Sequence, residues 1–199
     1  MVPKTQPKTQ WGIIGPGSIA RNFANGLAQS ASGVLTAIAG RDRARRDAFG
    51  DDFAIAPDMR HSNYQSLIAE PGLDAIYIAT PHPFHAEIAI KVMQAGKAVL
   101  VEKPAALNAA QVVALCEVAT LNDVFFMEGY MYRCHPQIAR MLEIIASGEI
   151  GTPRHIRTSF GFAARFDPAS RLFDPALGGG GILDVGGYPV SLARLVAGA

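Results

Sequence analysis

Residues 98–104 of this 199-residue chain read Ala-Val-Leu-Val-Glu-Lys-Pro. Val99, Leu100 and Val101 form an apolar, β-branched-rich run without polar alternation, which predicts a short strand buried on both faces, as in a parallel sheet. Pro104 cannot continue the strand, so Glu102 and Lys103 lie at its carboxyl end. Ligands of open α/β sheets bind at this edge, which makes Lys103 a candidate site residue. A lysine that only surfaces at a strand end is the alternative.

The length allows one domain and part of another. A hydrophobic content of 49% and a formal net charge of +1 indicate a globular protein and argue against a nucleic-acid surface or an electrostatic membrane anchor. We therefore expect small molecules or proteins as partners, with no nucleic acid and no membrane. No apolar run approaches the ~20 residues of a membrane span, and residues 1–10 lack the apolar core of a signal peptide, so we expect a cytoplasmic protein.

A glycine-rich turn follows the first predicted strand. A short apolar run at residues 11–15 leads into Gly-Pro-Gly-Ser-Ile-Ala at residues 15–20, and a helix follows. The first glycine permits the tight turn, the second lets the backbone approach a pyrophosphate, and the alanine lets helix pack on strand. A second apolar run at residues 34–39 completes a βαβ unit. This pattern predicts a dinucleotide site that includes Gly15, Gly17, Ser18, Ile19 and Ala20.

The residue after the second strand bears on which nicotinamide cofactor binds. NAD enzymes usually place a carboxylate there for the ribose 2′-hydroxyl, but here the sequence is Gly40-Arg41-Asp42. The Arg41 guanidinium suits a 2′-phosphate, which favours NADP, with NAD as the alternative because Asp42 follows. Arg41 and the arginines after it also fit a solvated helix face.

More candidate residues follow the fourth predicted strand, at residues 75–79. In the doubly wound order this strand lies beside the first, so Thr80 and Pro81 should lie close to the glycine-rich turn. His82 and His85 come next, and because no third ligand clusters with them we expect no metal. His85 either contacts the nicotinamide or substrate, or packs at the start of a helix.

Two further local patterns give expectations for the same domain. Ser62 and Gln65 have the spacing of a capping box before a short helix. Residues 124–127 predict a sixth buried strand, with Phe125 and Phe126 in the core.

The cysteine spacing points to reduced thiols. Cys116 and Cys134 have no CxxC or zinc spacing, so we expect both to be reduced, with Cys116 on an apolar helix face.

The predicted strands alternate with helices up to Met131, so we expect residues 1–131 to form an NAD(P)-binding Rossmann domain, a doubly wound parallel α/β sheet. Residues 132–199 then begin a different, α+β substrate and dimerisation domain. The evidence for this second domain is that side-chain character alternates with a period of two residues at residues 154–162. The pattern predicts a strand of another sheet, whose one face carries Ile156, Thr158, Phe160 and Phe162. A lone strand needs neighbours, so we expect this domain to be incomplete, its apolar face exposed, and the chain to be a fragment.

A glycine run at residues 178–181 precedes Asp184 and Tyr188. If a helix starts after the glycines, the two side chains are i and i+4 on one face. A flexible linker followed by an amphipathic helix is the alternative.

The combination of GPGSIA, ATPHPFH, AGKAVLVEKP, EGYMYR and GGGGILDVGGY resembles the glucose-fructose oxidoreductase/inositol dehydrogenase/MocA superfamily of nicotinamide-dependent oxidoreductases. The resemblance extends from about residue 11 to the end. The variant His-Pro-Phe-His at residues 82–85 is similar to the branch that holds dimeric dihydrodiol dehydrogenase and NADP-dependent xylose dehydrogenases. His82 stands where many members of the family carry Asn, which leaves the substrate open.

The resemblance implies NADP-dependent hydride transfer to or from a hydroxyl carbon of a sugar or cyclic diol. It assigns catalytic positions to Lys103, Tyr188 and Asp184, with Tyr188 exchanging the proton and Asp184 orienting the substrate or Lys103. His82, His85, Glu102 and Lys103 join the residues expected at the cofactor. A homo-oligomer built through the C-terminal sheet is also expected. The alternative function is an inactive nicotinamide-binding sensor or scaffold.

Overall fold

The computed structural model describes residues 7–198. The chain divides into two compact units, Met1–Glu128 and Gly129–Ala199. The boundary expected from the sequence, after Met131, lies close to this division.

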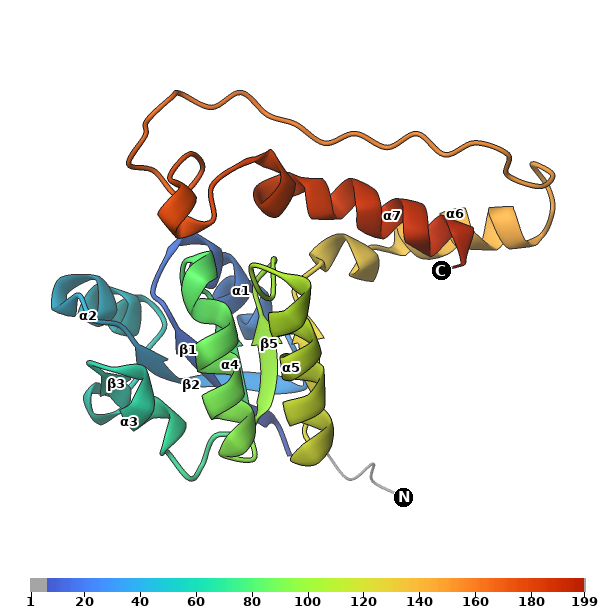
Figure 1. Cartoon of the computed structure of the whole chain (residues 1–199). Helices are drawn as coiled ribbons and strands as arrows, with labels where there is room; N and C mark the ends of the chain where they lie inside the picture. The colour runs from blue at the N-terminus through green and yellow to red at the C-terminus, as the bar shows by residue number, and fades with distance from the viewer. Residues whose placement is uncertain (1–6, 199) are drawn as a thin grey trace, which may run out of the picture. The chain divides into compact units, whose positions relative to one another are not determined.

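The first unit is a six-stranded parallel sheet with the strand order β3-β2-β1-β4-β5-β6 (Figure 1). Its strands are β1 (Thr9–Ile14), β2 (Gly33–Ala39), β3 (Arg60–His61), β4 (Ala75–Ile78), β5 (Ala98–Val101) and β6 (Phe126–Glu128). Its helices are α1 (Ser18–Ala28), α2 (Arg43–Asp52), α3 (Tyr64–Ile68), α4 (His85–Gln94) and α5 (Ala109–Leu121), with short 3₁₀ turns at Pro57–Met59 and His82–Phe84. The order reverses between β1 and β4, so the predicted doubly wound Rossmann sheet, with the fourth strand beside the first, is confirmed.

Two apolar cores cover the two faces of the sheet. On one face, Val99 and Val101 of β5 pack with residues of α4 and with Leu115 of α5. On the other face, Leu100 packs against a core that includes Phe49 of α2. The strand that precedes Lys103 is thus covered on both faces, as its sequence predicts, with the difference that Leu100 is only partly buried.

The sixth strand differs from the prediction. It begins at Phe126, and Phe125 is 67% exposed rather than part of the core. β6 lies at the edge of the sheet and pairs only with β5, so an apolar run here is not covered on both sides. Phe126 is partly buried and packs against the core.

Two smaller expectations are also wrong. α3 is capped by Asn63, whose side chain accepts a hydrogen bond from the Ser66 amide at 2.8 Å, and not by Ser62. Asparagine caps a helix as well as serine does, and being one residue closer to the helix it takes that role. Cys116 is a free thiol, but it is exposed, because the face of α5 that meets the core carries Leu115.

The second unit is helical. It contains a 3₁₀ turn at Met131–Cys134, α6 (Pro136–Ala146), a 3₁₀ turn at Pro175–Leu177, a π-helical turn at Ile182–Gly186 and α7 (Gly187–Ala197). The prediction of a helix after the glycine run is confirmed, with the difference that its first turn is π-helical.

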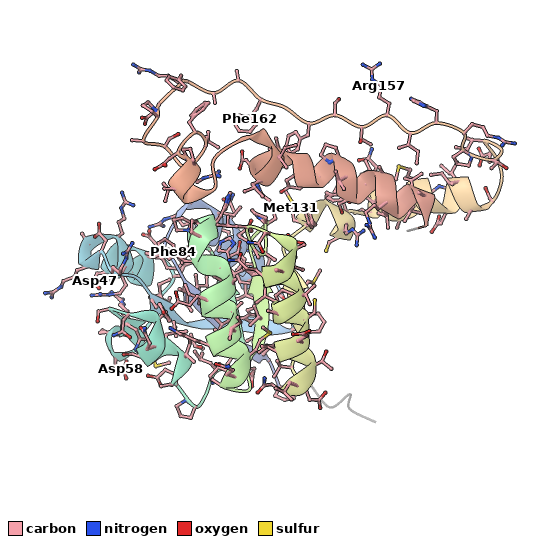
Figure 2. The ribbon with its side chains drawn as sticks, in the orientation of Figure 1. Asp47, Asp58, Phe84, Met131, Arg157 and Phe162 are labelled. Carbon is pink, nitrogen blue, oxygen red and sulfur yellow. The ribbon has the colours of Figure 1, made fainter. Side chains whose placement is uncertain are left out.

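The predicted strand at residues 154–162 does not form. The segment is extended and without regular structure, because the described part of this unit offers no strand for it to pair with. It runs alongside α7, where the Thr158 hydroxyl donates a hydrogen bond to the Pro189 carbonyl at 3.1 Å (Figures 1 and 2). Phe160 is 50% and Phe162 55% exposed, so the expected exposure of the apolar side chains is confirmed.

Candidate functional site

The glycine-rich turn after β1 touches the end of β4. Gly15 has a φ of +100°, and a Cβ placed on it would lie 2.8 Å from the Ala79 carbonyl oxygen and 3.1 Å from the Thr80 amide nitrogen. Glycine is therefore required for the backbones to approach this closely. The predicted proximity of Thr80 to this turn is confirmed.

Gly17 lies in the opposite environment. A Cβ on it would meet nothing within 4 Å, and the residue caps α1 in an extended conformation. The first-turn amides of α1, from Ser18 to Ala20, have no acceptor within the helix. Ala20 is fully buried, while Ser18 and Ile19 are exposed. The turn thus leaves open space in front of amides that suit an anion.

At the carboxyl end of β4, Thr80 carries a buried hydroxyl that has no hydrogen-bond partner among residues 7–198. A buried hydroxyl without a partner is uncommon and marks a place where a ligand or water completes the bonding. Pro81 follows, and His82 is 6% exposed.

The segment that carries Lys103 is held on both sides of that residue. The Tyr77 hydroxyl donates to the Glu102 carboxylate at 2.5 Å. The Ala105 amide donates to the Glu128 carboxylate at 2.8 Å. The peptide bond between Lys103 and Pro104 is cis. These contacts fix the backbone around Lys103, and neither Tyr77 nor Glu128 has a sequence signal that predicts such a role.

His85 is fully buried at the start of α4. Its Nδ1 lies 2.7 Å from the Pro104 carbonyl oxygen, and its Nε2 lies 2.7 Å from the Thr80 carbonyl oxygen. The ring thereby links the loop after β4 to the loop after β5.

A cavity of about 510 Å³ opens beside the end of β2. Four of its lining residues are arginines, and the lining comprises Arg41, Arg43, Arg46, Asp47, Pro57, Arg60 and Ser62. The surroundings favour an anion.

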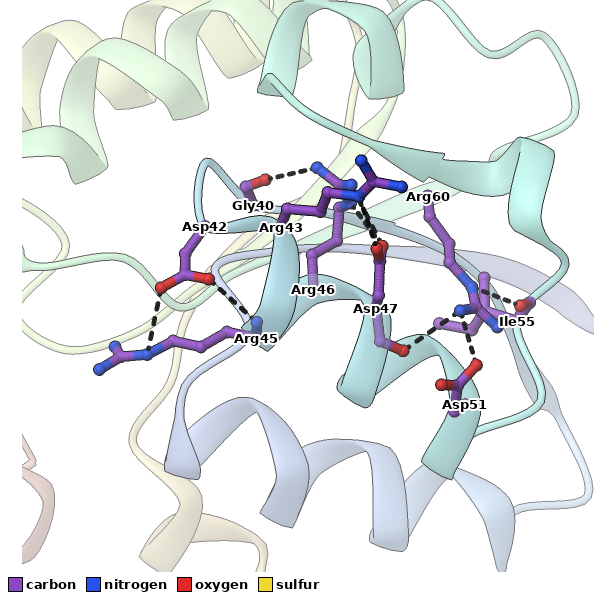
Figure 3. A network of polar contacts seen from close by, with 9 residues as sticks. All are labelled: Gly40, Asp42, Arg43, Arg45, Arg46, Asp47, Asp51, Ile55 and Arg60. Atoms are coloured by element: carbon purple, nitrogen blue, oxygen red, sulfur yellow. Dashed lines mark hydrogen bonds and ion pairs between the residues drawn. The ribbon is translucent and has the colours of Figure 1, made fainter.

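Most of these arginines are already engaged (Figure 3). Arg43 and Arg46 pair with Asp47 at 3.3 and 3.1 Å, and Arg60 pairs with Asp51 at 2.7 Å. These side chains stabilise α2 and its surroundings, and their charges are partly compensated.

Arg41 and Asp42 take no part in the ion pairs with Asp47 and Asp51. Asp42 caps α2 by accepting a hydrogen bond from the Arg45 amide at 3.0 Å, and its carboxylate also pairs with the Arg45 side chain at 3.7 Å. Arg41 is exposed and forms no hydrogen bond or ion pair with any residue that the structure describes. The guanidinium of Arg41 is therefore available to a ligand, while the carboxylate of Asp42 is engaged within its own helix.

The remaining candidates belong to the second unit. Asp184 lies in the π-helical turn, is 6% exposed, and accepts a hydrogen bond from Arg171 at 2.8 Å. Tyr188 is the second residue of α7, and its hydroxyl donates to the Met131 sulfur at 3.3 Å. Single-turn π-helices are frequent at functional sites. Arg171 precedes Asp184 by 13 residues and belongs to no motif, so the sequence did not predict the pair.

Aromatic rings surround Tyr188 within its unit. The centroid of its ring lies 5.3 Å from that of Tyr130, 6.0 Å from that of Tyr132 and 5.2 Å from that of Phe160. A Cβ on Gly187 would collide with the Tyr130 hydroxyl, so the glycine lets α7 start close to this ring. The phenol of Tyr188 is thus held in a defined, half-buried position.

No group of three potential metal ligands occurs within residues 7–198. Over the same range, the helices are too short or too polar to cross a membrane.

A parallel sheet with its glycine-rich turn at the point where the strand order reverses defines a dinucleotide-binding Rossmann domain. The sequence model of an oxidoreductase family with an NAD-binding Rossmann fold, GFO/IDH/MocA, matches residues 9–130, and the model of the GFO/IDH/MocA C-terminal domain matches residues 138–199. The chain belongs to the GFO/IDH/MocA oxidoreductase family.

Two curated relatives carry enzyme names. The chain is 35% identical to trans-1,2-dihydrobenzene-1,2-diol dehydrogenase of Mus musculus over 96% of its own length and 56% of the relative's. It is also 35% identical to D-xylose 1-dehydrogenase (NADP(+)) 2 of Haloferax volcanii, over 94% and 57% of the two lengths. These are enzymes of the branch expected from the sequence. The chain spans little more than half the length of these relatives.

Solved structures of other proteins share the fold of this chain. Aldose-aldose oxidoreductase from Caulobacter crescentus, complexed with glycerol, superposes with a TM-score of 0.90 at 26% identity, covering 96% of this chain and 58% of that one. A 3-ketoreductase from Actinomadura kijaniata in complex with NADP and TDP-benzene superposes with a TM-score of 0.81 at 28% identity, covering 96% and 58%.

Proposed function

We propose that the protein is an NADP-dependent oxidoreductase that transfers a hydride between the nicotinamide and a hydroxyl carbon of a sugar or cyclic diol. The observation that carries this proposal is the open backbone at Gly17 together with the buried, unpartnered hydroxyl of Thr80 at the switch point of the sheet. The names of the mouse and Haloferax relatives, a diol dehydrogenase and a xylose dehydrogenase, support the substrate class.

The residues present fit a dinucleotide. The α1 amides behind Gly17 would hold the pyrophosphate, and the Thr80 hydroxyl would bond to the cofactor at the end of β4. Arg41, which has no partner in the described chain and lines the arginine-rich cavity, would hold the 2′-phosphate. The nicotinamide, when bound, supplies the hydride acceptor or donor.

The chain's own residues would manage the proton of the hydroxyl. We assign the transfer of this proton, and the orientation of the groups involved, to Lys103, Tyr188 and Asp184. Tyr188 exchanges the proton with help from the Lys103 ammonium, and Asp184, held by Arg171, orients the substrate or Lys103. The protein is proposed to act in the cytoplasm as a homo-oligomer, with its domain boundary near residues 131 and 132.

The reaction is tested by a screen of aldoses, inositols and cyclic diols with NADP, followed through the absorbance of the reduced cofactor. General acid–base catalysis is worth roughly 10²- to 10⁴-fold in rate, so Lys103→Ala should leave less than about a tenth of the activity. Lys91→Ala, which changes an exposed lysine of α4, is the matched control and should keep full activity. A Lys103→Ala variant as active as the control would refute the assignment.

The cofactor is tested by fluorescence titration with NADPH and NADH. A hydrogen bond to a charged group contributes about 1.5 to 3 kcal/mol, so Arg41→Ala should weaken NADPH binding by roughly one to two decades and leave NADH binding unchanged. Arg45→Ala is the control, because Arg45 lies outside the cavity and pairs with Asp42. Equal affinity of the unmutated protein for both cofactors would contradict the choice of NADP.

A further inference from the structure

The arginine-lined cavity beside the end of β2 receives side chains from two loops. Arg41 comes from the loop after β2 and Ser62 from the loop after β3. The two strands are parallel neighbours, with Ala39 paired to His61. Beyond this pair, the Gly40 amide donates a hydrogen bond to the His61 carbonyl at 3.0 Å. The two loops therefore leave the same edge of the sheet side by side, and Arg41 and Ser62 line one cavity.

Two other arginines of the cavity are fixed by the chain itself. Arg46 donates to the Gly40 carbonyl at 3.3 Å and pairs with Asp47 at 3.1 Å (Figure 3). Arg60 donates to the Ile55 carbonyl at 2.8 Å and pairs with an aspartate of α2. These guanidinium groups shape the wall of the cavity, and their bonds to the protein limit what they can offer a ligand.

The Ser62 hydroxyl is not engaged in this way. Ser62 is exposed and forms no hydrogen bond with any residue that the structure describes, because Asn63 takes the capping position of α3 in its place. The backbone on either side is held, since His61 is buried and the Asn63 side chain accepts from the Ser66 amide at 2.8 Å. A hydroxyl can donate to an anionic oxygen, so Ser62 presents a free donor from a fixed backbone position.

We propose that Ser62 is a specificity-determining residue for the cofactor, and that its hydroxyl donates a hydrogen bond to the 2′-phosphate held by Arg41. The inference rests on the proposed function, in which this cavity takes the 2′-phosphate of NADP. It adds a second ligand to that phosphate, from a different loop and a different strand of the sheet. A hydrogen bond to a charged oxygen is stronger than one to a neutral hydroxyl, so this donor favours NADP over NAD.

The charge at position 62 decides the preference because the other nearby carboxylates are occupied. Asp42 caps α2 and pairs with Arg45, and Asp47 pairs with Arg43 and Arg46. A carboxylate at position 62 would have no such partner. It would repel a 2′-phosphate and would accept a hydrogen bond from the ribose 2′-hydroxyl of NAD.

The test is fluorescence titration of single variants with NADPH and NADH. Ser62→Ala removes the donor and should weaken NADPH binding about ten-fold while leaving NADH binding nearly unchanged. Ser62→Asp should weaken NADPH binding at least about a hundred-fold, through repulsion and the lost donor, and should bind NADH at least as tightly as the unmutated chain. Ser32→Ala and Ser32→Asp make the same changes at an exposed serine before the amino end of β2, and both should bind like the unmutated chain.

The outcomes separate this inference from the proposed function. A preference for NADPH in the unmutated chain that Ser62→Ala keeps in full would overturn the role of Ser62 and leave the choice of NADP standing. Equal affinity of the unmutated chain for the two cofactors would overturn both. Because Ser62→Asp keeps its binding of NADH, repulsion of the phosphate is distinguished from a loss of folding, and an Asp variant that still prefers NADPH would refute the inference.

Discussion

Replacing Gly15 with alanine tests how the glycine-rich turn is built. The residue has a φ of +100°, which an L side chain rarely adopts, and strain of this kind costs about 1 to 3 kcal/mol. The new Cβ would also lie 2.8 Å from the Ala79 carbonyl oxygen, closer than such atoms normally approach, and the obstructing atom is sheet-end backbone rather than a flexible side chain. Overpacking of this sort costs roughly another 1 to 3 kcal/mol.

One effect opposes these costs. Alanine has less conformational freedom than glycine in the unfolded chain, and this raises the free energy of unfolding by about 0.4 to 1 kcal/mol. Gly15→Ala should therefore lower the free energy of unfolding by about 1 to 6 kcal/mol, a large part of the roughly 5 to 15 kcal/mol typical of a domain. The assay is urea unfolding followed by the fluorescence of Trp11, the single tryptophan, which lies in β1 and packs against Phe23 with ring centroids 5.2 Å apart.

Gly17→Ala is the matched control, because the same methyl group is added two residues away where nothing lies within 4 Å. Its stability should change by less than about 1 kcal/mol, since the loss of a favoured capping residue and the restricted unfolded chain nearly cancel. Its NADPH affinity should instead fall at least about ten-fold, because the Cβ occupies the approach of the proposed pyrophosphate. If Gly15→Ala were no less stable than Gly17→Ala, the explanation from close backbone approach would be refuted.

Three further predictions concern stability. Phe49 is fully buried in the core, so Phe49→Ala should lower the free energy of unfolding by about 3 to 5 kcal/mol in the same urea assay. Burial lowers the pKa of Lys97, so the lysine holds its proton more tightly in the unfolded chain than in the folded one. The free energy of unfolding should therefore rise with pH between the lowered pKa of the folded state and 10.5. A Lys97→Met variant should lose this pH dependence. The hydrogen bond between Lys91 and Glu87 lowers the pKa of Glu87 and raises the pKa of Lys91 to about 12. The stabilisation by this pair should therefore be lost at low pH, as the pH falls through the lowered pKa of Glu87, and at high pH, as the pH rises above 10.5 through about 12. A double-mutant cycle with Glu87→Gln and Lys91→Gln should give a small coupling energy that vanishes in about 1 M salt.

Local patterns in the sequence determined the architecture of the first unit. The glycine spacing at residues 15–20 predicted the turn because its backbone requirements lie within six residues. The apolar runs predicted β1, β2, β4 and β5, since a strand buried on both faces is apolar along its whole length. Arg41 became a candidate for a similar reason, because it lies two residues after the end of β2.

Tertiary structure decided what depends on partners far along the chain. The apolar run at Phe125 resembles that of a buried strand, but it lies at a sheet edge and is largely exposed. The alternating segment at residues 154–162 has a strand-like pattern, but it finds no neighbouring strand in the described part of the chain and stays without regular structure. Among the candidate residues, His85 of the first unit reaches Pro104 across 19 residues, and Asp184 of the second unit meets Arg171 across 13; neither spacing has a local signature. The sequence by itself named the candidate site residues, whereas only the folded chain decided their partners, because a hydrogen bond is set by distances in space rather than by separation along the chain.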